Sequence, residues 1–300
     1  MPKSLIIRHL REMSSKKELK NPVFIIGSVR SGTTILGDIL SQHKDVAYWL
    51  EPKYIWRYGK ARSKHDLRYA HEATPLVKKY IRKRFTDFTN TLGKKQFIEK
   101  TPSNVFRISF IREIFPNGRF IQIVRNGNDS ALSAEKKWTT IPDRSAIKRR
   151  LTKNEIPWSE LPFYTMASVR DVLGRGLFPS KGFIWGQQFE GIEAYRKEHS
   201  IIETCAKQWS EGMRVSIEEM QSIPEAQKFI FRYEDLSSQL GDKLIDILSF
   251  LELDIDQKVL DYAAQKVFNT KTRTYTETDV EKMDKIKPII EKEMKILGYL

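Results

Sequence analysis

Short apolar runs alternate with longer amphipathic stretches along the 300-residue chain. Five of these runs are rich in β-branched and aromatic residues, a composition typical of strands buried on both faces of a parallel sheet. They lie at 23–26, 45–51, 97–100, 120–124 and 229–233. Strands that alternate with helices predict a three-layer α/β fold, with a central parallel sheet flanked by helices.

The stretches between these runs carry apolar residues at helical spacing. One follows the first strand, and another occupies much of 54–91. At Thr101-Pro102 an early proline and hydroxyl caps indicate a helix start. Further helices are predicted at 201–217, 240–251 and 256–268, before a last one that ends near Leu297.

The first strand leads into a turn at Gly27 that is rich in backbone N–H groups and hydroxyls. A second glycine, Gly32, opens the next helix, and a helix N-terminus offers unpaired N–H donors and a partial positive charge to phosphate. Arg30 adds a planar cation suited to phosphate or sulfate oxygens. The glycine spacing is similar to that of a Walker-type P-loop, but Thr33 replaces its lysine, which argues against ATP or GTP hydrolysis. The other interpretation of this turn is a plain connector.

Three more predicted strands end in polar residues, namely Glu51, Lys100 and Arg125. Because the carboxyl ends of parallel strands meet at one edge, these residues are expected in one crevice with the loop. Ser133 lies two turns into the helix after Arg125, so that both could hold one anion. Each residue has a structural alternative: Glu51 could simply end its strand, Lys100 could be a solvated turn residue, and Arg125 could pair with Asp129 as a brace.

The composition is strongly basic, with a formal net charge of +14. A charge of this size implies anionic partners, such as nucleic acid, a membrane surface or small polyanions. The single cysteine, Cys205, excludes an internal disulfide and a cysteine-based metal cage. The chain has no run long enough for a membrane span and no signal-peptide pattern, from which we expect a cytoplasmic protein.

No linker, repeat or low-complexity tract divides the chain, and one domain is expected over 1–300. Residues 1–20 are polar and basic, which predicts an N-terminal arm. The pattern loosens over 136–200, where prolines, glycines and aromatic residues predict a lid or an acceptor-binding insertion.

Together these motifs resemble the sulfotransferase family, whose sulfuryl donor is 3′-phosphoadenosine-5′-phosphosulfate (PAPS). The loop from Gly27 to Thr34 is similar to the family's 5′-phosphosulfate loop, in the arginine-bearing form of tyrosylprotein and many bacterial members. The stretch from Arg125 to Ser133 is similar to its 3′-phosphate motif. Also in the family's order are Glu51-Pro52, Lys100-Thr101-Pro102, Tyr233-Glu234-Asp235-Leu236 and Leu297-Gly298-Tyr299. The resemblance implies a P-loop-type fold.

The resemblance also implies roles for single residues. Glu51 is expected as the general base, because none of the five histidines lies where the small-molecule enzymes have their catalytic histidine. Arg30 and Lys100 are expected to stabilise charge on the transferring group, and no metal is required. The residues expected to bind the donor are Ser28, Val29, Arg30, Ser31, Gly32, Thr33, Thr34, Arg125, Ser133, Tyr233, Lys271 and Arg273.

The sequence departs from the commoner family pattern in two places. Arg30 stands where the cytosolic enzymes have lysine, and the 3′ motif reads Arg125-Asn126-Gly127-Asn128-Asp129 instead of Arg-Asp-Pro. The second departure leaves the geometry of the turn open.

The acceptor is expected to bear a hydroxyl or an amine, and acidic glycans, lipids, peptides and small alcohols all stay open. Nucleic acid is not expected as a partner. Two other functions are consistent with parts of the sequence. One is a P-loop kinase, which the missing lysine disfavours. The other is a non-catalytic basic module that binds nucleic acid or an anionic membrane.

Overall fold

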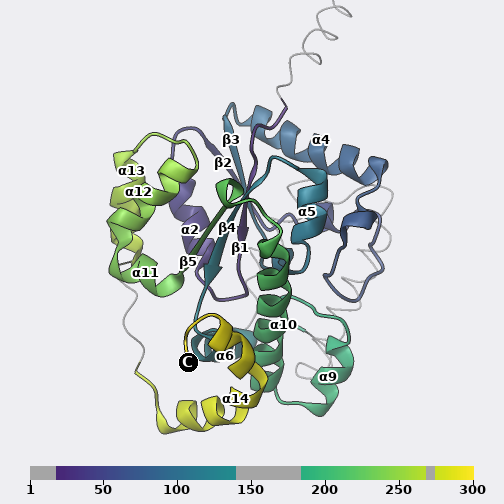
Figure 1. Cartoon of the computed structure of the whole chain (residues 1–300), viewed down its shortest axis with the longest axis vertical. Helices are drawn as coiled ribbons and strands as arrows, with labels where there is room; N and C mark the ends of the chain where they lie inside the picture. The colour runs from purple at the N-terminus through teal and green to yellow at the C-terminus, as the bar shows by residue number, and fades with distance from the viewer. Residues whose placement is uncertain (1–17, 140–183, 268–273) are drawn as a thin grey trace, which may run out of the picture.

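Five parallel strands form the centre of the computed structural model, in the spatial order β2-β3-β1-β4-β5 (Figure 1). The structure describes residues 18–139, 184–267 and 274–300. Within these ranges the strands are β1 Val23–Ile26, β2 Val46–Leu50, β3 Gln96–Lys100, β4 Arg119–Val124 and β5 Lys228–Arg232. Each neighbouring pair is parallel. The predicted parallel sheet is therefore confirmed.

Helices connect the strands and cover the sheet. The α-helices are α2 Thr33–Leu40, α3 Lys53–Trp56, α4 Pro75–Thr91, α5 Ile108–Ile114, α6 Gly127–Trp138, α9 Ile192–Glu198, α10 Ile201–Gln221, α11 Tyr233–Ser238, α12 Leu240–Phe250, α13 Gln257–Val267 and α14 Glu277–Ile296. Short 3₁₀-helices lie at Ala70–Glu72, Pro102–Phe106 and Glu225–Gln227. Across the described ranges, no helix combines the length and the apolar character that crossing a membrane requires.

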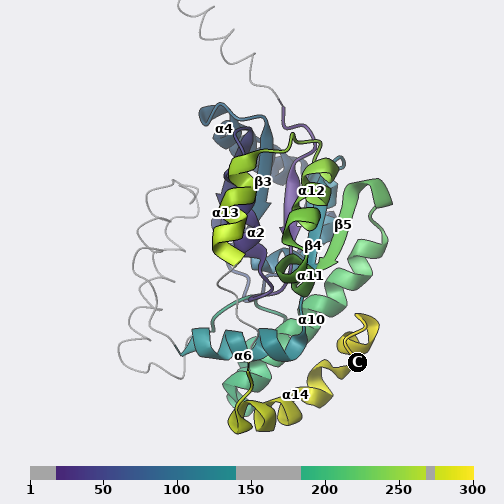
Figure 2. The same ribbon diagram turned by 90° about the vertical axis from the view of Figure 1, so that its left-hand side faces the viewer.

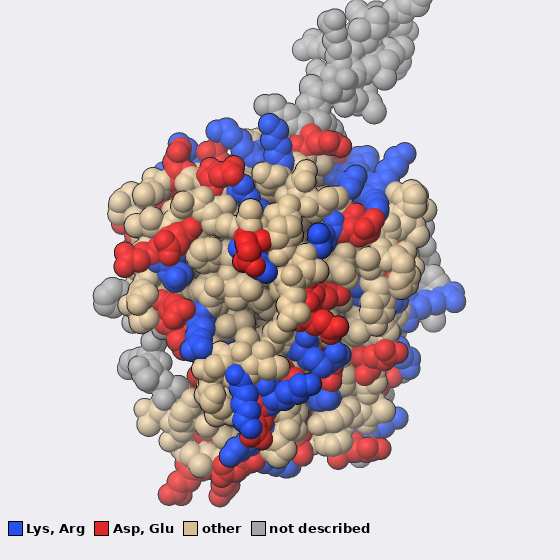
Figure 3. All heavy atoms as spheres, viewed as in Figure 1, with Lys and Arg blue, Asp and Glu red and all other residues tan. Residues whose placement is uncertain are grey.

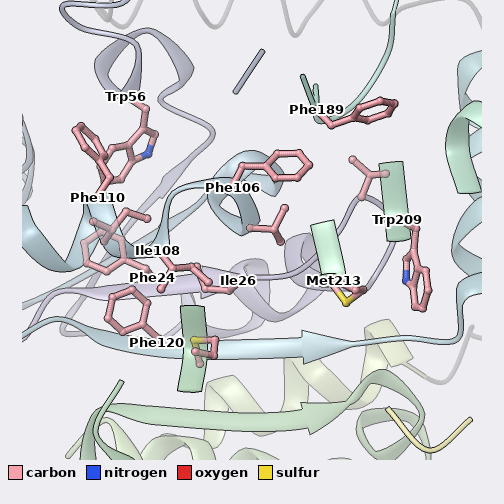
Figure 4. Close-up of a cluster of buried hydrophobic side chains, with 14 of the residues drawn as sticks. Phe24, Ile26, Trp56, Phe106, Ile108, Phe110, Phe120, Phe189, Trp209 and Met213 are labelled. Carbon is pink, nitrogen blue, oxygen red and sulfur yellow. The ribbon is translucent and has the colours of Figure 1, made fainter. Parts of the chain in front are cut away.

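The two faces of the sheet are covered by different helices, because successive residues of a strand point to opposite faces. Phe24 and Ile26 of β1 pack in one cluster with residues of α4, α5 and α10. Val23 and Ile25 pack in a second cluster with α2, α12 and α13, which lie together in Figure 2. Figure 4 shows the first cluster, where the rings of Phe24 and Phe120 are 5.8 Å apart. Each fully buried side chain of this size contributes about 1.5–3 kcal/mol, so the two clusters fix the three layers.

The chain differs from its sequence pattern after β3. One helix was expected from Thr101, but the 3₁₀-helix at Pro102–Phe106 comes first and α5 begins only at Ile108. The 3₁₀ turn brings Asn104 Nδ2 within 2.7 Å of the buried Glu99 carboxylate, to which it donates. This tertiary contact favours a short 3₁₀-helix at the position where the sequence pattern alone predicts the first turns of an α-helix. The last strand also ends one residue earlier than expected, because Tyr233 begins α11.

The direction of strand addition reverses at β1. The chain passes from β1 to β2 and β3 on one side, and then to β4 and β5 on the other. In open α/β sheets, ligands bind outside the carboxyl ends of the strands near such a reversal. The loop after β1 therefore lies at the centre of the predicted binding edge, with α6 and α14 beyond it (Figures 1 and 2).

Candidate active site

The loop from Gly27 to Gly32 joins β1 to α2 through two positions that only glycine fits. A Cβ on Gly27 would lie 2.6 Å from Ser31 Oγ. Gly32 has a φ of +88°, and a Cβ there would lie 2.3 Å from Cδ2 of the Tyr233 ring. The Ser31 hydroxyl donates to Ser28 O at 2.6 Å and closes the turn. Close contacts on both sides therefore fix the shape of the loop.

Two glutamines from a distant part of the chain support the buried side of this loop. Gln187 Oε1 accepts from the Val29 N–H at 3.0 Å, and its Nε2 donates to Ser28 Oγ at 2.9 Å and to Gln208 O at 2.7 Å. Gln208 Nε2 donates back to Gln187 O at 2.7 Å. Both side chains are completely buried. Neither glutamine is predicted from the sequence, although Gln208 lies three residues after Cys205 on the buried stripe of α10.

The side chains of the loop divide into a buried and an exposed set. Four predicted donor-binding residues have buried side chains that support the loop: Ser28, Val29, Ser31 and Thr33. The side chains of Arg30 and Thr34 are exposed. α2 begins at Thr33 without a side-chain cap, which leaves the N–H groups of its first turn available to a ligand. The loop therefore offers backbone donors and two exposed polar side chains to an anion.

Lys100, at the end of β3, joins the loop to the end of β2. Its Nζ donates to Thr34 Oγ1 at 2.9 Å and to Glu51 Oε1 at 3.1 Å. The Lys100 side chain is 3% exposed and that of Glu51 is 23% exposed. The ion pair is thus shielded, while the carboxylate stays accessible. A lysine ammonium has three N–H donors, so one remains for a ligand besides these two contacts.

Arg30, Arg125 and Ser133 form a second cluster on the β4 side of the loop. Arg30 Nε donates to Ser133 Oγ at 3.0 Å, and Arg125 Nη1 donates to Arg30 O at 2.8 Å. The Arg125 guanidinium lies 4.3 Å from the centroid of the Tyr233 ring. Burial and the charge of Arg125 lower the pKa of Arg30. Neither arginine has a carboxylate partner within the described ranges, and an oxoanion would stabilise both.

The turn between β4 and α6 has its own supports, which explain the unusual 3′ motif. Trp209 Nε1 donates to Arg125 O at 3.2 Å, and a Cβ on Gly127 would lie 3.0 Å from the Trp209 ring. Gly127 takes the first helical position, where the commoner motif has proline, and its N–H donates to Met294 Sδ at 3.1 Å. Asn126 Oδ1 caps the helix. The altered sequence therefore still forms a well-supported turn.

The segment after α14 reaches the same turn through Glu234. This carboxylate accepts from the Asn126 N–H at 3.3 Å and from the Tyr299 hydroxyl at 2.8 Å. Arg232 Nη2 donates to Leu297 O at 2.8 Å, and its guanidinium lies 4.9 Å from the centroid of the Tyr299 ring. Burial and Glu234 raise the pKa of Tyr299. Tyr299 therefore helps to hold the residue next to Arg125.

The remaining predictions have mixed outcomes. The structure places Lys100 with Glu51 and Thr34, whereas Arg30 lies with the second cluster. The suggested brace between Arg125 and Asp129 is not formed in the described part of the chain, where Asp129 instead accepts from the Tyr275 hydroxyl at 3.0 Å. Lys271 and Arg273 lie outside the described residues, as does 140–183 of the expected insertion at 136–200.

Two further observations bear on the chemistry that this edge can perform. Among residues 18–139, 184–267 and 274–300, no group of three or more His, Cys, Asp or Glu side chains is placed to hold a metal ion. Cys205 is buried in α10, and burial raises the pKa of its thiol. A protonated, inaccessible thiol is a poor nucleophile, so Cys205 has a packing role.

Comparisons with known proteins relate the chain to one family. The profile described as "Sulfotransferase family" matches residues 22–159. In sequence, the chain is 22% identical over 130 residues to the nodulation protein NoeE of Sinorhizobium fredii, a match that covers 38% of this chain and 31% of that protein.

Two solved structures have a similar fold. The sulfotransferase domain from the curacin biosynthetic pathway has a TM-score of 0.53 at 15% identity, covering 95% of this chain and 99% of that one. Sulfotransferase STF9 from Mycobacterium avium has a TM-score of 0.54 at 11% identity, covering 97% of this chain and 81% of that one. At these identities the likeness shows a shared fold, and it confirms the predicted fold class.

Proposed function

We propose that the chain, which matches the sulfotransferase family profile over residues 22–159, transfers a sulfuryl group from PAPS to a hydroxyl or an amine of an acceptor. The observation that carries this proposal is Lys100, whose Nζ joins the loop at Thr34 to the carboxylate of Glu51. A carboxylate, an ammonium group and the start of a helix thus meet at one edge of the sheet, which supports the proposal. The acceptor's identity and a cytoplasmic location stay predictions.

The residues around the loop have the chemistry that PAPS requires. The first-turn N–H groups of α2 and the Thr34 hydroxyl suit its 5′-phosphosulfate. Arg125 and Ser133 suit its 3′-phosphate. Ser133 Oγ accepts from Arg30, so its own proton stays available to a phosphate oxygen. Arg125 Nε is buried without a hydrogen-bond partner, which fits a site that an anion completes.

Sulfuryl transfer requires a base for the acceptor and positive charge near the leaving group. When bound, PAPS supplies the activated sulfuryl group. Glu51 takes the proton of the attacking hydroxyl or amine, and such general-base help is typically worth about 10²- to 10⁴-fold in rate. Lys100 holds the carboxylate of Glu51 in place and has one N–H left for a leaving-group oxygen. A preorganised donor of this kind contributes about 3–4 kcal/mol. Arg30 adds charge from the side of Ser133.

Thermal unfolding with adenosine 3′,5′-bisphosphate, the product of the donor, tests this proposal. At 100 times its Kd, a ligand of the native state adds about 2.7 kcal/mol to the free energy of unfolding. For a protein of this size we expect a rise in Tm of several degrees. Adenosine 5′-monophosphate should give a smaller rise, because it lacks the 3′-phosphate, and Arg125→Ala should remove the difference between the two nucleotides. No rise with the bisphosphate in the wild-type protein means that the proposal is wrong.

A further inference from the structure

A cationic pocket lies next to the candidate active site, and none of its residues belongs to the proposed donor site. The charged and titratable side chains of its lining are Arg57, Lys60, His65, Asp66, Arg68 and Arg107. Its space measures about 180 Å³, part of which is open to solvent. A small space that is partly open to solvent cannot enclose a whole ligand, but it can admit a single charged group of one.

The pocket is built from the two chain segments that follow Glu51 and Lys100. α3 begins two residues after Glu51 and leads directly into Arg57. Arg107 follows Lys100 by seven residues, and its Nε donates to Ser103 O at 3.1 Å. Both segments thus start from the edge of the sheet that carries Glu51 and Lys100.

Positive charge exceeds negative charge in this pocket. Lys60 and Arg68 share one carboxylate, that of Glu72, at 2.7 Å and 3.6 Å. Arg57 and Arg107 form no ion pair within the described ranges. Burial lowers the pKa of Arg107 to about 10, although nearby carboxylates oppose this shift. An added anion would offset that cost.

The polar atoms of the pocket are also incompletely satisfied. Asp66 Oδ2 accepts from Ser103 Oγ at 2.6 Å and from the Gln188 N–H at 2.9 Å, so this carboxylate is already engaged. In the described structure, Arg57 Nε and His65 Nδ1 are buried without a hydrogen-bond partner. Buried polar atoms are nearly always hydrogen-bonded, and Arg57 Nε is an N–H donor, so that its missing partner in this cationic pocket points to an anion.

We propose that this pocket binds an oxoanion group of the acceptor, either a carboxylate or a sulfate. The proposal rests on the proposed sulfuryl transfer, and it narrows the acceptor to molecules with a negative charge close to the hydroxyl or amine that is sulfated. Guanidinium groups bind such oxoanions through paired N–H···O bonds. A neutral alcohol brings no negative charge to Arg57 and Arg107, and we expect it to bind less tightly.

Titration with simple anions tests the pocket without a known acceptor. The protein, saturated with adenosine 3′,5′-bisphosphate to fill the donor site, is titrated with sulfate and with acetate at constant ionic strength, and binding is followed by NMR. Arg57→Gln should weaken binding of the preferred anion at least about tenfold. The matched control is Arg62→Gln, which changes an exposed arginine of the same segment outside the pocket and should bind as the wild type does.

Each outcome decides something. Preference for acetate identifies a carboxylate acceptor group, and preference for sulfate identifies a sulfate group. Equal affinities of the wild type and Arg57→Gln for both anions overturn the proposal. If Arg57→Gln does not fold, wild-type crystals soaked in selenate give the answer, since anomalous signal is expected between Arg57 and Arg107, and its absence at saturation overturns the proposal. If the nucleotide does not bind, the proposed function fails, while the same titration of nucleotide-free protein still tests the pocket.

Discussion

Two candidate active-site residues have a backbone conformation that non-glycine residues rarely adopt. The φ of Arg30 is 67° and that of Glu51 is 54°, and within the described ranges Asn21 and Glu252 are the other non-glycine residues with positive φ. Such a position costs of order 1–3 kcal/mol and persists where its surroundings enforce it. For Glu51 the enforcing contact is its N–H, which donates to Lys100 O at 2.8 Å. The same contact places the carboxylate beside the Lys100 ammonium.

The role of Glu51 as a base can be separated from its structural role. We expect Glu51→Gln to lower kcat about 10²- to 10⁴-fold, because an amide cannot take the acceptor proton. Its affinity for adenosine 3′,5′-bisphosphate should stay unchanged in calorimetry. The matched control is Glu252→Gln, which changes an exposed glutamate that also has positive φ, at 57°, and pairs with Arg119 instead. If Glu51→Gln keeps most of its turnover, Glu51 is not the base.

The contact between Gly32 and Tyr233 predicts a second effect at the scale of single residues. In Gly32→Ala the added methyl group would overlap with the Tyr233 ring. The substitution also forces alanine into the left-handed backbone conformation that Gly32 adopts. We expect it to lower the free energy of unfolding by about 1–2 kcal/mol from strain, with about 1–3 kcal/mol more from the overlap. Because Tyr233 supports the Arg125 guanidinium, nucleotide affinity should fall too.

Gly93→Ala is the matched control for this change. Gly93 also has positive φ, at +64°, but nothing lies within 4 Å of its added Cβ. Urea unfolding should therefore show the strain cost alone, and calorimetry should show wild-type affinity for the nucleotide. Equal losses of unfolding free energy in the two variants would mean that overlap with Tyr233 does not affect the stability of Gly32→Ala.

At the scale of elements, the sequence predicts what local pattern determines. The strands and the loop from Gly27 to Thr34 follow from apolar runs and glycine positions, and the sheet order then brings Glu51, Lys100 and Arg125 to one edge. The residues that hold the site in place from distant parts of the chain could not be predicted in this way. Gln187 contacts a loop about 160 residues away through amide groups that carry no motif, and such pairings depend on tertiary packing.

The segment after α14 gives a prediction about such a support. Tyr299→Phe removes the hydroxyl that donates to Glu234, and a hydrogen bond to a charged group contributes about 1.5–3 kcal/mol. We expect the free energy of unfolding to fall by about that amount and the nucleotide Kd to rise several-fold, because Glu234 also holds Asn126 beside Arg125. The measurements are urea unfolding and calorimetry.

Tyr262→Phe provides the control for this change, since Tyr262 lies on α13 and its ring contacts Lys266. That variant should bind the nucleotide as the wild type does. An unchanged Kd in Tyr299→Phe would show that the segment stabilises the fold without acting on the donor site.

At the scale of the whole molecule, the net charge of +14 predicted anionic partners but not where they bind. On the face seen in Figure 3, Lys and Arg side chains are mixed with Asp and Glu. Many of the described basic residues lie in ion pairs, as Lys60 does with Glu72. The cations that matter for the proposals are instead those that form no ion pair within the described ranges, namely Arg30, Arg57, Arg107 and Arg125. Whether a basic residue forms an ion pair depends on burial and packing, and the number of basic residues in the sequence does not show it.

Carboxylates in such contacts also set how the whole protein responds to acid, and Glu203 is the clearest case. It accepts from the Ser200 hydroxyl and from the Ser200 N–H at 2.9 Å, and it pairs with Lys285 of α14 at 3.0 Å. These contacts, led by the Ser200 hydroxyl, lower the pKa of Glu203 to about 2, against about 4.3 in an unfolded chain. The unfolded state therefore binds more protons between these values, so that the stabilisation is complete above about pH 5 and is lost as the pH falls towards 2.

Glu203→Gln removes this contribution. Urea unfolding should show lower stability than wild type at pH 7, and the difference between the two proteins should shrink as the pH falls from 5 to 3. The matched control is Glu190→Gln, which changes an exposed glutamate and should follow the wild-type curve throughout. A constant difference across this range would contradict the prediction, because the contribution of Glu203 would then not depend on its charge. Convergence at low pH would show that the charge of Glu203 stabilises the contact between α10 and α14.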